Sequence, residues 1–376
     1  YVGEVPGSLS GNPQGNTVLG IDAGIALTSG ANNTLIGNDA GKALTTAASN
    51  VIIGKNAGLA KTSGSNATII GTSAARSTAS GNMVVLIGSE AGISNTGDNA
   101  IAIGSESGRV NTAAATVSIG HNSGYSNTSG AESTNIGYQA GYSNTTGGEN
   151  VNVGYTAGKF QTQGGNVFVG RRSGLGVSGS STGYNNTGIG QSALWTVTSG
   201  NGNTGVGQSA GAGISTGYNN TAIGNNALAS ANTNIGCVVI GNGANASTTT
   251  VVNEVTISSQ SGAARFAGAA TAWTFVSDKR DKKDIEDLEL GLDFINKLKP
   301  RKFKWDIRGT EIDKNKEASG FIAQEVQETL EEAGADYTGI VDKNNLEQFT
   351  LAQANIVPML VKAIQELKAE IELLKQ

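Results

Sequence analysis

Residues 134–141 read Thr-Asn-Ile-Gly-Tyr-Gln-Ala-Gly, and variants of this stretch recur through the first two thirds of the chain. An apolar residue followed by glycine returns almost always after sixteen or seventeen residues. The copies stand at Leu19-Gly20, Ile36-Gly37, Ile53-Gly54, Ile70-Gly71, Ile87-Gly88, Ile103-Gly104, Ile119-Gly120, Ile136-Gly137, Val153-Gly154, Val169-Gly170, Ile189-Gly190, Val206-Gly207, Ile223-Gly224 and Ile240-Gly241. A short fixed period of this kind is typical of proteins in which successive repeats stack.

Two positions of the repeat alternate along an expected strand. The residue before the glycine is always Ile, Leu or Val, and the residue two positions earlier is always Thr, Val or Ile, as in Ile36 and Thr34. Spacing of two places both on one face of a strand, where β-branched residues fit well. The residue between them ranges from Phe168 to Asn152 to Gly188, so we expect it to face a less demanding environment.

A third position predicts how each repeat turns. Three residues after the glycine only alanine or serine occurs, as at Ala23 and Ser107, which predicts a tight inner corner. Asn-Thr and Thr-Ser-Gly runs between the copies supply residues that tolerate positive φ. Repeats this short hold brief strands and turns, and stacking lets each bury an apolar face. We therefore predict a mainly β fold, a parallel β-solenoid of about fourteen coils and, at about 4.8 Å per coil, roughly 65 Å long.

Composition divides the chain and excludes several classes of function. Nearly all of the 55 glycines precede Ser277, whereas charged residues crowd after it. Charges before about Ala246 are sparse and balanced, which argues against binding of nucleic acid or an anionic membrane. One histidine, His121, and one cysteine, Cys237, build neither a disulfide framework nor a zinc site within one chain. No apolar run is long enough to span a bilayer, so we expect no membrane insertion. We also expect no metal and no cofactor.

The repeats resemble the head repeats of YadA-like trimeric adhesins, whose Asn-Thr-x-Ile-Gly and Ala-Gly elements occur here at residues 219–224 and at Ala140-Gly141. The resemblance covers about residues 15–246, although the present repeat is longer. It implies a left-handed parallel β-roll in which three chains pack side by side. Residues 247–276 break the period and are predicted to form a β-rich neck.

The sequence from residue 277 reads Ser-Asp-Lys-Arg-Asp-Lys-Lys-Asp-Ile. It resembles the S74 peptidase family, the intramolecular chaperones of endosialidases and other phage tail fibres and spikes, whose signature is Ser-Asp-x-Arg-x-Lys followed by isoleucine. Further matches lie at residues 298–305, at residues 320–326 and in the C-terminal helix. Asp281 and Ser319 depart from the usual pattern, but neither change removes a reactive group. The resemblance spans residues 277–376.

The family resemblance implies self-cleavage of the peptide bond between Val276 and Ser277, with Ser277 as nucleophile and Lys282 as base. A lysine acts as a base when burial or nearby cations lower its pKa, and a Ser-Lys pair replaces the triad in several proteases. The cut proceeds either by direct hydrolysis or through an ester formed by acyl shift. Neighbouring Lys283 is a rival base or a neighbour that lowers the pKa of Lys282. Supporting roles are expected for Asp278, Arg280, Gln324 and Glu325.

The C-terminal residues Leu360, Ile364, Leu367, Ile371 and Leu374 are spaced four and three apart, which predicts a coiled-coil seam of about two heptads. The expected organisation is a solenoid over residues 1–246, a neck over 247–276, an α+β chaperone over 277–355 and a coiled-coil helix over 356–376. Three identical solenoid chains can pair in several registers, because a shift by one coil again matches apolar faces. A chaperone that trimerises first would set the correct register of the three chains.

These features predict a homotrimeric phage tail fibre or spike for host attachment, assembled in the host cytoplasm, carried on the virion and acting outside the cell. Its partners would be a glycan or protein receptor on the host surface, and other virion proteins bound through a region preceding Tyr1. The alternative is a bacterial or injection-system adhesin with a non-cleaving trimerisation cap. An ice-binding solenoid is disfavoured because the residue between the paired strand positions varies. A glycan-cleaving spike is disfavoured because no pair of carboxylates stands out in the repeats.

Overall fold

The computed structural model describes residues 15–230, 233–259, 262–267, 274–275, 279, 282–304, 317–342 and 349–375. The chain forms two compact units, Tyr1–Val276 and Ser277–Gln376. Each unit is built on its own core, and each is described separately below.

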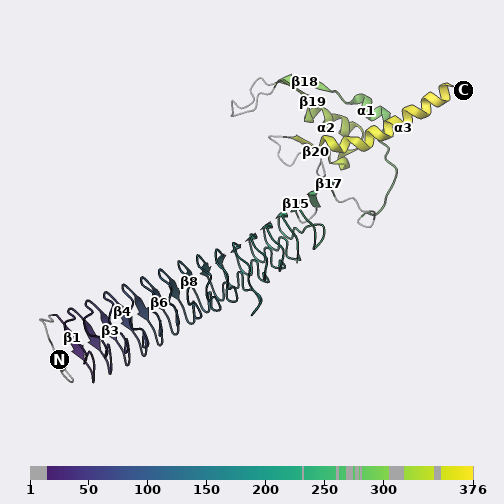
Figure 1. Ribbon diagram of the computed structural model, residues 1–376. Coiled ribbons are helices and arrows are strands. Elements are labelled where there is room, and N and C mark those ends of the chain that lie inside the picture. Colours follow the sequence, from purple (N-terminus) through teal and green to yellow (C-terminus); the bar gives the residue numbers. More distant parts are fainter. Residues whose placement is uncertain are drawn as a thin grey trace. The chain divides into compact units, whose positions relative to one another are not determined.

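The first unit is a stack of coils, each contributing one three-residue strand to a long parallel sheet (Figure 1). Its strands pair in register, with Thr34, Leu35 and Ile36 opposite Val51, Ile52 and Ile53. The strands are β1 (Thr17–Leu19), β2 (Thr34–Ile36), β3 (Val51–Ile53), β4 (Thr68–Ile70), β5 (Val85–Ile87), β6 (Ile101–Ile103), β7 (Val117–Ile119), β8 (Thr134–Ile136), β9 (Val151–Val153), β10 (Val167–Val169), β11 (Thr187–Ile189), β12 (Thr204–Val206), β13 (Thr221–Ile223) and β14 (Val238–Ile240). The predicted β-solenoid of about fourteen coils is confirmed.

The orientation of the strands corrects one expectation from the sequence. The variable middle residue of every strand is buried, whereas its two conserved neighbours are partly or fully exposed in the single chain. Leu35 is completely buried, while Thr34 and Ile36 flank it on the outer face. The middle position is therefore the core position, and the expectation that it faces a less demanding environment is wrong. The variation of this residue was also used against an ice-binding solenoid, and that argument no longer holds, because the residue is not on the outer face.

The interior tolerates variation because side chains from other positions fill the space. Strands β11 and β12 carry Gly188 and Gly205 at the core position, and the buried side chains of Phe168 and Leu194 lie beside them, respectively. A Cβ added to Gly205 would lie 3.2 Å from Leu194 Cγ. In β8 and β9 the core position is polar, and Asn152 Nδ2 donates a hydrogen bond to Asn135 Oδ1 at 2.9 Å. Each coil thus needs a filled interior rather than one particular residue.

The inner corner predicted after each glycine is confirmed. Its alanines and serines are completely buried, among them Ala23, Ala40, Ala57, Ser107 and Ala210. The preceding glycines hold φ near +130° and lie directly against the glycine of the next coil. A Cβ added to Gly120, whose φ is +127°, would lie 2.6 Å from the carbonyl oxygen of Gly137. Glycine recurs there because no side chain fits between consecutive coils.

Substitution of this glycine should weaken the stack. We expect Gly120→Ala to lower the free energy of unfolding by on the order of 3 kcal/mol, because it adds a backbone clash to an unfavourable φ. Gly179 is a matched control, since its φ is +73° and no atom lies within 4 Å of an added Cβ. Gly179→Ala should cost only about 1 kcal/mol. Denaturant unfolding of both variants provides the comparison, and equal losses would show that the close approach of coils is unimportant.

Lys61 is a buried ionisable group inside the solenoid. It is completely buried at a corner where Leu27 and Leu44 occupy the two preceding coils, and its Nζ donates a hydrogen bond to the carbonyl oxygen of Gly81 at 2.9 Å. Burial lowers the pKa of Lys61 to about 8, against a smaller opposing effect of the Asp98 charge. The charged ammonium is therefore less stable in the folded coil than in the unfolded chain.

This depressed pKa gives a pH dependence with a defined sign. Between about pH 8 and the unfolded lysine pKa of about 10.4, the unfolded chain binds more protons, so stability should rise with pH. Lys61→Met should remove that rise and stabilise the solenoid at pH 7 by about 1–3 kcal/mol. Lys55 is exposed, so Lys55→Met is the control, which should neither remove the rise in stability with pH nor stabilise the solenoid at pH 7. Melting temperatures at pH 7, 8 and 9.5 provide the measurement, and a lower melting temperature for Lys61→Met at pH 7 would contradict the prediction.

The stack continues past the last glycine-marked repeat. Strand β15 (Glu254–Ser259) pairs with β14 in the same parallel register, with Val255 opposite Val238 and Ile257 opposite Ile240. The sheet then reverses, since β16 (Gly262–Ala267) and β17 (Thr274–Phe275) pair antiparallel. The segment following Ala246 therefore begins as one more coil before it becomes a small antiparallel extension.

In its described residues the second unit combines short strands with three α-helices. In chain order it contains α1 (Leu292–Lys297), β18 (Arg301–Lys304), β19 (Glu317–Gly320), α2 (Ala323–Glu332), η2 (Asp336–Thr338), β20 (Val341–Asp342), β21 (Thr350–Leu351), η3 (Gln353–Ile356) and α3 (Val357–Leu374). Strands β18 and β19 pair antiparallel, as do β20 and β21. The core joins α1, α2 and the start of α3 through Phe294, Val326, Leu330, Ile356 and Met359. The predicted C-terminal helix is present.

Candidate functional site

The boundary between the two compact units is the peptide bond between Val276 and Ser277. Val276, Ser277, Asp278 and Arg280 lie outside the described residues, so the expected nucleophile and its bond remain predictions. After the single described residue Lys279, the described chain resumes at Lys282.

Lys282, the predicted base, is exposed in the single chain. Its backbone N–H donates a hydrogen bond to the carbonyl oxygen of Lys279 at 3.2 Å, which closes a turn just after the predicted cleavage site. A lysine acts as a general base when burial or a neighbouring cation lowers its pKa. The described residues of one chain do not bury this side chain, so the burial that such a base needs is not supplied by them.

Glu325, expected to support the site, is held by an arginine from the neighbouring hairpin. Arg301 on β18 donates from Nε at 2.9 Å and from Nη2 at 2.6 Å to the two carboxylate oxygens of Glu325, near the start of α2. The hydrogen bonds from Arg301 lower the pKa of Glu325 and keep it ionised. This paired arrangement fixes the β18–β19 hairpin to α2. Gln324, the other expected supporting residue, is exposed.

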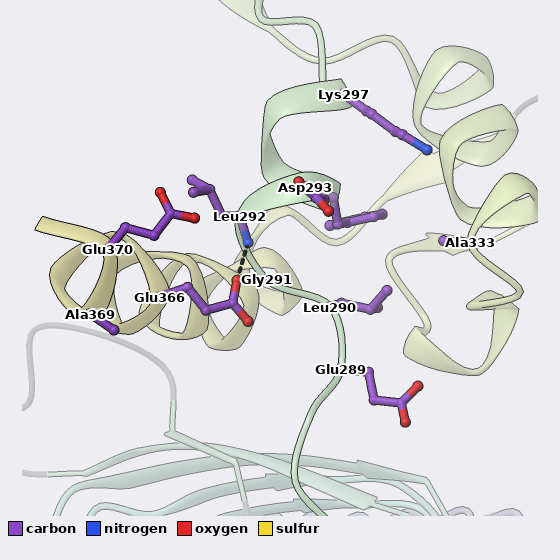
Figure 2. A pocket seen from close by; sticks show the side chains of 11 residues that line it. Glu289, Leu290, Gly291, Leu292, Asp293, Lys297, Ala333, Glu366, Ala369 and Glu370 are labelled. Atoms are coloured by element: carbon purple, nitrogen blue, oxygen red, sulfur yellow. Dashed lines mark hydrogen bonds between the residues drawn. The ribbon is translucent and has the colours of Figure 1, made fainter. Parts of the chain in front are cut away.

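A hollow of about 500 Å³ lies between α1, α3 and the end of α2 (Figure 2). Glu366 on α3 reaches the start of α1, where its Oε2 accepts a hydrogen bond from the backbone N–H of Leu292 at 2.7 Å. Gly291 leaves room for this carboxylate, because an added Cβ would overlap the Glu366 side chain. Glu289, Asp293 and Glu370 also line the hollow. Glu366 therefore caps the first helix from the last one, and the sequence analysis missed this link.

Two classes of site find no support in the part of the chain that the structure describes. No helix there has the length and apolar character required to cross a membrane. No group of histidine, cysteine, aspartate and glutamate side chains there is arranged to hold a metal ion.

Comparison with known proteins finds a match to part of the second unit. Residues 277–335 match the family model of the S74 peptidases, described as the chaperone of endosialidase. No curated protein and no solved structure matches the chain. The match begins at Ser277, the first residue of the second unit, and extends through α2 to Ala335. Over residues 277–335, the C-terminal unit is therefore similar to the S74 peptidase family of chaperones.

Proposed function

We propose that this protein is a homotrimeric attachment fibre of a phage, assembled by its C-terminal chaperone, which then cuts itself off between Val276 and Ser277. The rod of coils is the mature product, carried on the virion and directed at a receptor on the host surface. The chaperone match at residues 277–335 supports the assembly role. One feature of the solenoid supports the oligomer.

The outer face of the long sheet carries an unbroken apolar column and is uncovered in the single chain. Its first column holds Thr, Val or Ile, and its second column holds Leu, Ile or Val, from Leu19 through Ile257. Leu19, Ile189, Ile223 and Ile257 are 40–48% exposed, Thr17 is exposed, and the others are partly exposed. Exposed apolar surface of this extent is typical of protein interfaces. We therefore name these two columns the outer apolar face and assign to it the contacts between chains.

The period of the outer apolar face favours further copies of this chain as its occupant. Its side chains repeat once per coil along fifteen consecutive parallel strands, β1 to β15. Another rod of the same repeat matches it coil for coil over that length, whereas a partner with another period would match only part. Its second column contains no threonine, which also distinguishes it from the threonine arrays expected of ice-binding solenoids.

The C-terminal helix offers a second contact between chains. Met359 and Ala363 face the core of their own unit, while the predicted seam residues of α3 remain exposed. Leu360 is 42%, Ile364 66% and Ile371 43% exposed. A seam with this spacing is buried when helices pair in parallel. Association through α3 would align the chains before their coils meet.

The cleavage chemistry follows from the two proposed reactive residues. Lys282, buried by assembly, takes the hydroxyl proton of Ser277 as Oγ attacks the carbonyl carbon of Val276. The bond from that carbon to the Ser277 nitrogen breaks, the nitrogen takes up the proton, and an ester joins Val276 to Oγ. Water then hydrolyses the ester to a Val276 carboxylate and a free Ser277 hydroxyl. Direct attack of water on the same carbonyl is the alternative route to the same products.

Separation of the chaperone would make assembly difficult to reverse. Once the chaperone has been released, the trimer cannot dissociate by reversing the steps of its assembly. Its lifetime is then set by the rate of unfolding. The test is intact-mass analysis and sedimentation of the recombinant chain. We expect fragments 1–276 and 277–376, with the rod sedimenting as a trimer. An uncut trimer would reduce the second unit to a trimerising cap, and a monomeric rod would refute the assignment of the outer apolar face.

A further inference from the structure

The coils of β7 to β10 differ from the rest on their outer surface. One residue after the repeat glycine they carry His121, Tyr138, Tyr155 and Arg171, whereas no other coil has an aromatic residue at this position. The Tyr138 and Tyr155 rings stack with centroids 5.1 Å apart, and His121 lies 5.6 Å from Tyr138. The coils on either side fold without these rings. The fold itself therefore does not require this aromatic column.

A parallel column lies five residues after the glycine. Tyr125 and Tyr142 stack with centroids 4.9 Å apart, and cations stand at both ends of the pair. Arg109 Cζ lies 5.4 Å from the Tyr125 centroid, and Lys159 Nζ lies 5.8 Å from that of Tyr142. Because each face is covered by a ring or a cation, this column presents ring edges and hydroxyl groups outward.

Cations without acidic partners adjoin these rings. Within the described residues, no ion pair joins Lys159, Arg171 or Arg172 to a carboxylate. The backbone N–H of Arg172 donates to the carbonyl oxygen of Tyr155 at 2.9 Å, which places the arginines in the coil next to Tyr155. The outward turns 121–126, 138–143, 155–160 and 171–176 contain these three cations and no acidic residue. This local surface is therefore basic, although the whole chain has a net charge of −5.

The two columns run through the outward turns of the same coils. Ion pairs elsewhere show that side chains two and five positions after the glycine touch, as Lys42 does with Asp39 at 2.8 Å. Lys159 stands in the same coil as Tyr155, and Arg171 and Arg172 stand in the following coil. We define the tyrosine–cation patch as Tyr138, Tyr142, Tyr155, Lys159, Arg171 and Arg172. Tyr138 and Tyr155 are 41% and 49% exposed, and no hydrogen bond joins either hydroxyl to another described residue.

We infer that the tyrosine–cation patch binds an anionic polysaccharide. Unpaired cations attract the acid groups of such a polymer, and outward phenol hydroxyls hydrogen-bond its hydroxyl groups. Tyrosine and arginine are also enriched at binding hot spots because they combine apolar area with polar contacts. The inference rests on the proposed attachment function only in that it names the receptor class. It predicts binding by the purified rod without any cell.

Binding of polygalacturonate, heparin and dextran to the assembled protein tests the patch. We expect the two anionic polymers to bind and neutral dextran not to bind. The triple variant Lys159→Gln, Arg171→Gln, Arg172→Gln should lose at least tenfold in affinity. The double variant Lys55→Gln, Arg76→Gln is the matched control, because it removes exposed cations from the same two columns in other coils and should change affinity less than twofold. Tyr138→Phe with Tyr155→Phe keeps the stacked rings and should cost about threefold.

Several results would overturn the inference. Binding of neither polymer, an unchanged triple variant, or an equal loss in the control would each do so. Equally tight binding of single-stranded DNA would replace the glycan site with general attraction of polyanions, and an unchanged tyrosine variant would remove the hydroxyl contacts. Sedimentation and mass analysis of the same samples separate the two proposals. A cleaved trimer that binds no polysaccharide refutes the patch alone, whereas a protein that neither trimerises nor cleaves refutes the proposed function.

Discussion

The chains of Ser277→Ala and Lys282→Ala should both stay whole at 376 residues, while the parent chain is cut. Alanine at 277 removes the oxygen that attacks the Val276 carbonyl, and alanine at 282 removes the proposed acceptor of its proton. Loss of a nucleophile or its base typically reduces the rate by at least about 10³-fold. Intact-mass analysis over a time course measures the uncut fraction directly.

Lys283→Ala provides the control for this experiment. Lys283 is the exposed neighbour of Lys282 and a cation of the same kind, so its removal should leave cleavage largely intact. Loss of cleavage only on changing Lys283 would transfer the role of base to that residue. A cut Ser277→Ala chain would refute the proposed nucleophile. Sedimentation of each uncut variant separates failed chemistry from failed assembly, because the chaperone should still form trimers.

Paired acidic substitutions in the outer apolar face should dissociate the released rods. Ile119→Glu with Ile136→Glu places two carboxylates per chain where we propose that three chains meet, and burial of unpaired charges costs several kcal/mol each. We expect monomers by sedimentation, with the β-sheet circular dichroism largely retained because both side chains lie outside the coil interior. The same number of charges placed elsewhere in these coils should not dissociate the trimer.

Ser129→Glu with Thr146→Glu supplies that comparison, since both residues are exposed in turns between the strands. This variant should remain trimeric. If the isoleucine variant also remains trimeric, the outer apolar face is not the contact between chains. If it loses its β-sheet signal, Ile119→Ser with Ile136→Ser tests the same face without adding charge, and trimers of that variant with unchanged stability would again count against the assignment.

The sequence predicted the stack but not the direction in which its strands face. Period and corner residues such as Ala23 were sufficient for the solenoid, because only a repeated coil places glycine and alanine at fixed offsets. Alternation shows that Thr34 and Ile36 share a face, but it does not show which face is the interior. Both faces of these strands carry apolar residues, so the variation of the middle residue among the repeats wrongly suggested that this residue faces outward. Leu35 is the buried residue, and its position varies because neighbouring coils compensate.

The chaperone segment was recognised from Ser277 onward, yet the contacts that organise its unit were not. Arg301 pairs with Glu325 across 24 residues, and Leu292 with Glu366 across 74. Charges are frequent in this region, so spacing alone gives no reason to select these partners. The helix cap by Glu366 could be found only once α1 and α3 were placed together. The match of Ser277 and Lys282 to a family signature supplied information that periodicity could not.

Because single short strands pair in register, the length of the solenoid is set by the number of its coils. In the described part of the solenoid the strand of each coil pairs with the strands of the coils before and after it, and Gln161 Nε2 also donates to the carbonyl oxygen of Val197 two coils away at 3.1 Å. Whole repeats can therefore be gained or lost with little change in how most of the remaining ones fit. Duplication of one 17-residue unit, such as the step from Ile36 to Ile53, would lengthen the solenoid by about 4.8 Å. Reach would then evolve in discrete increments, by copying short stretches of coding sequence.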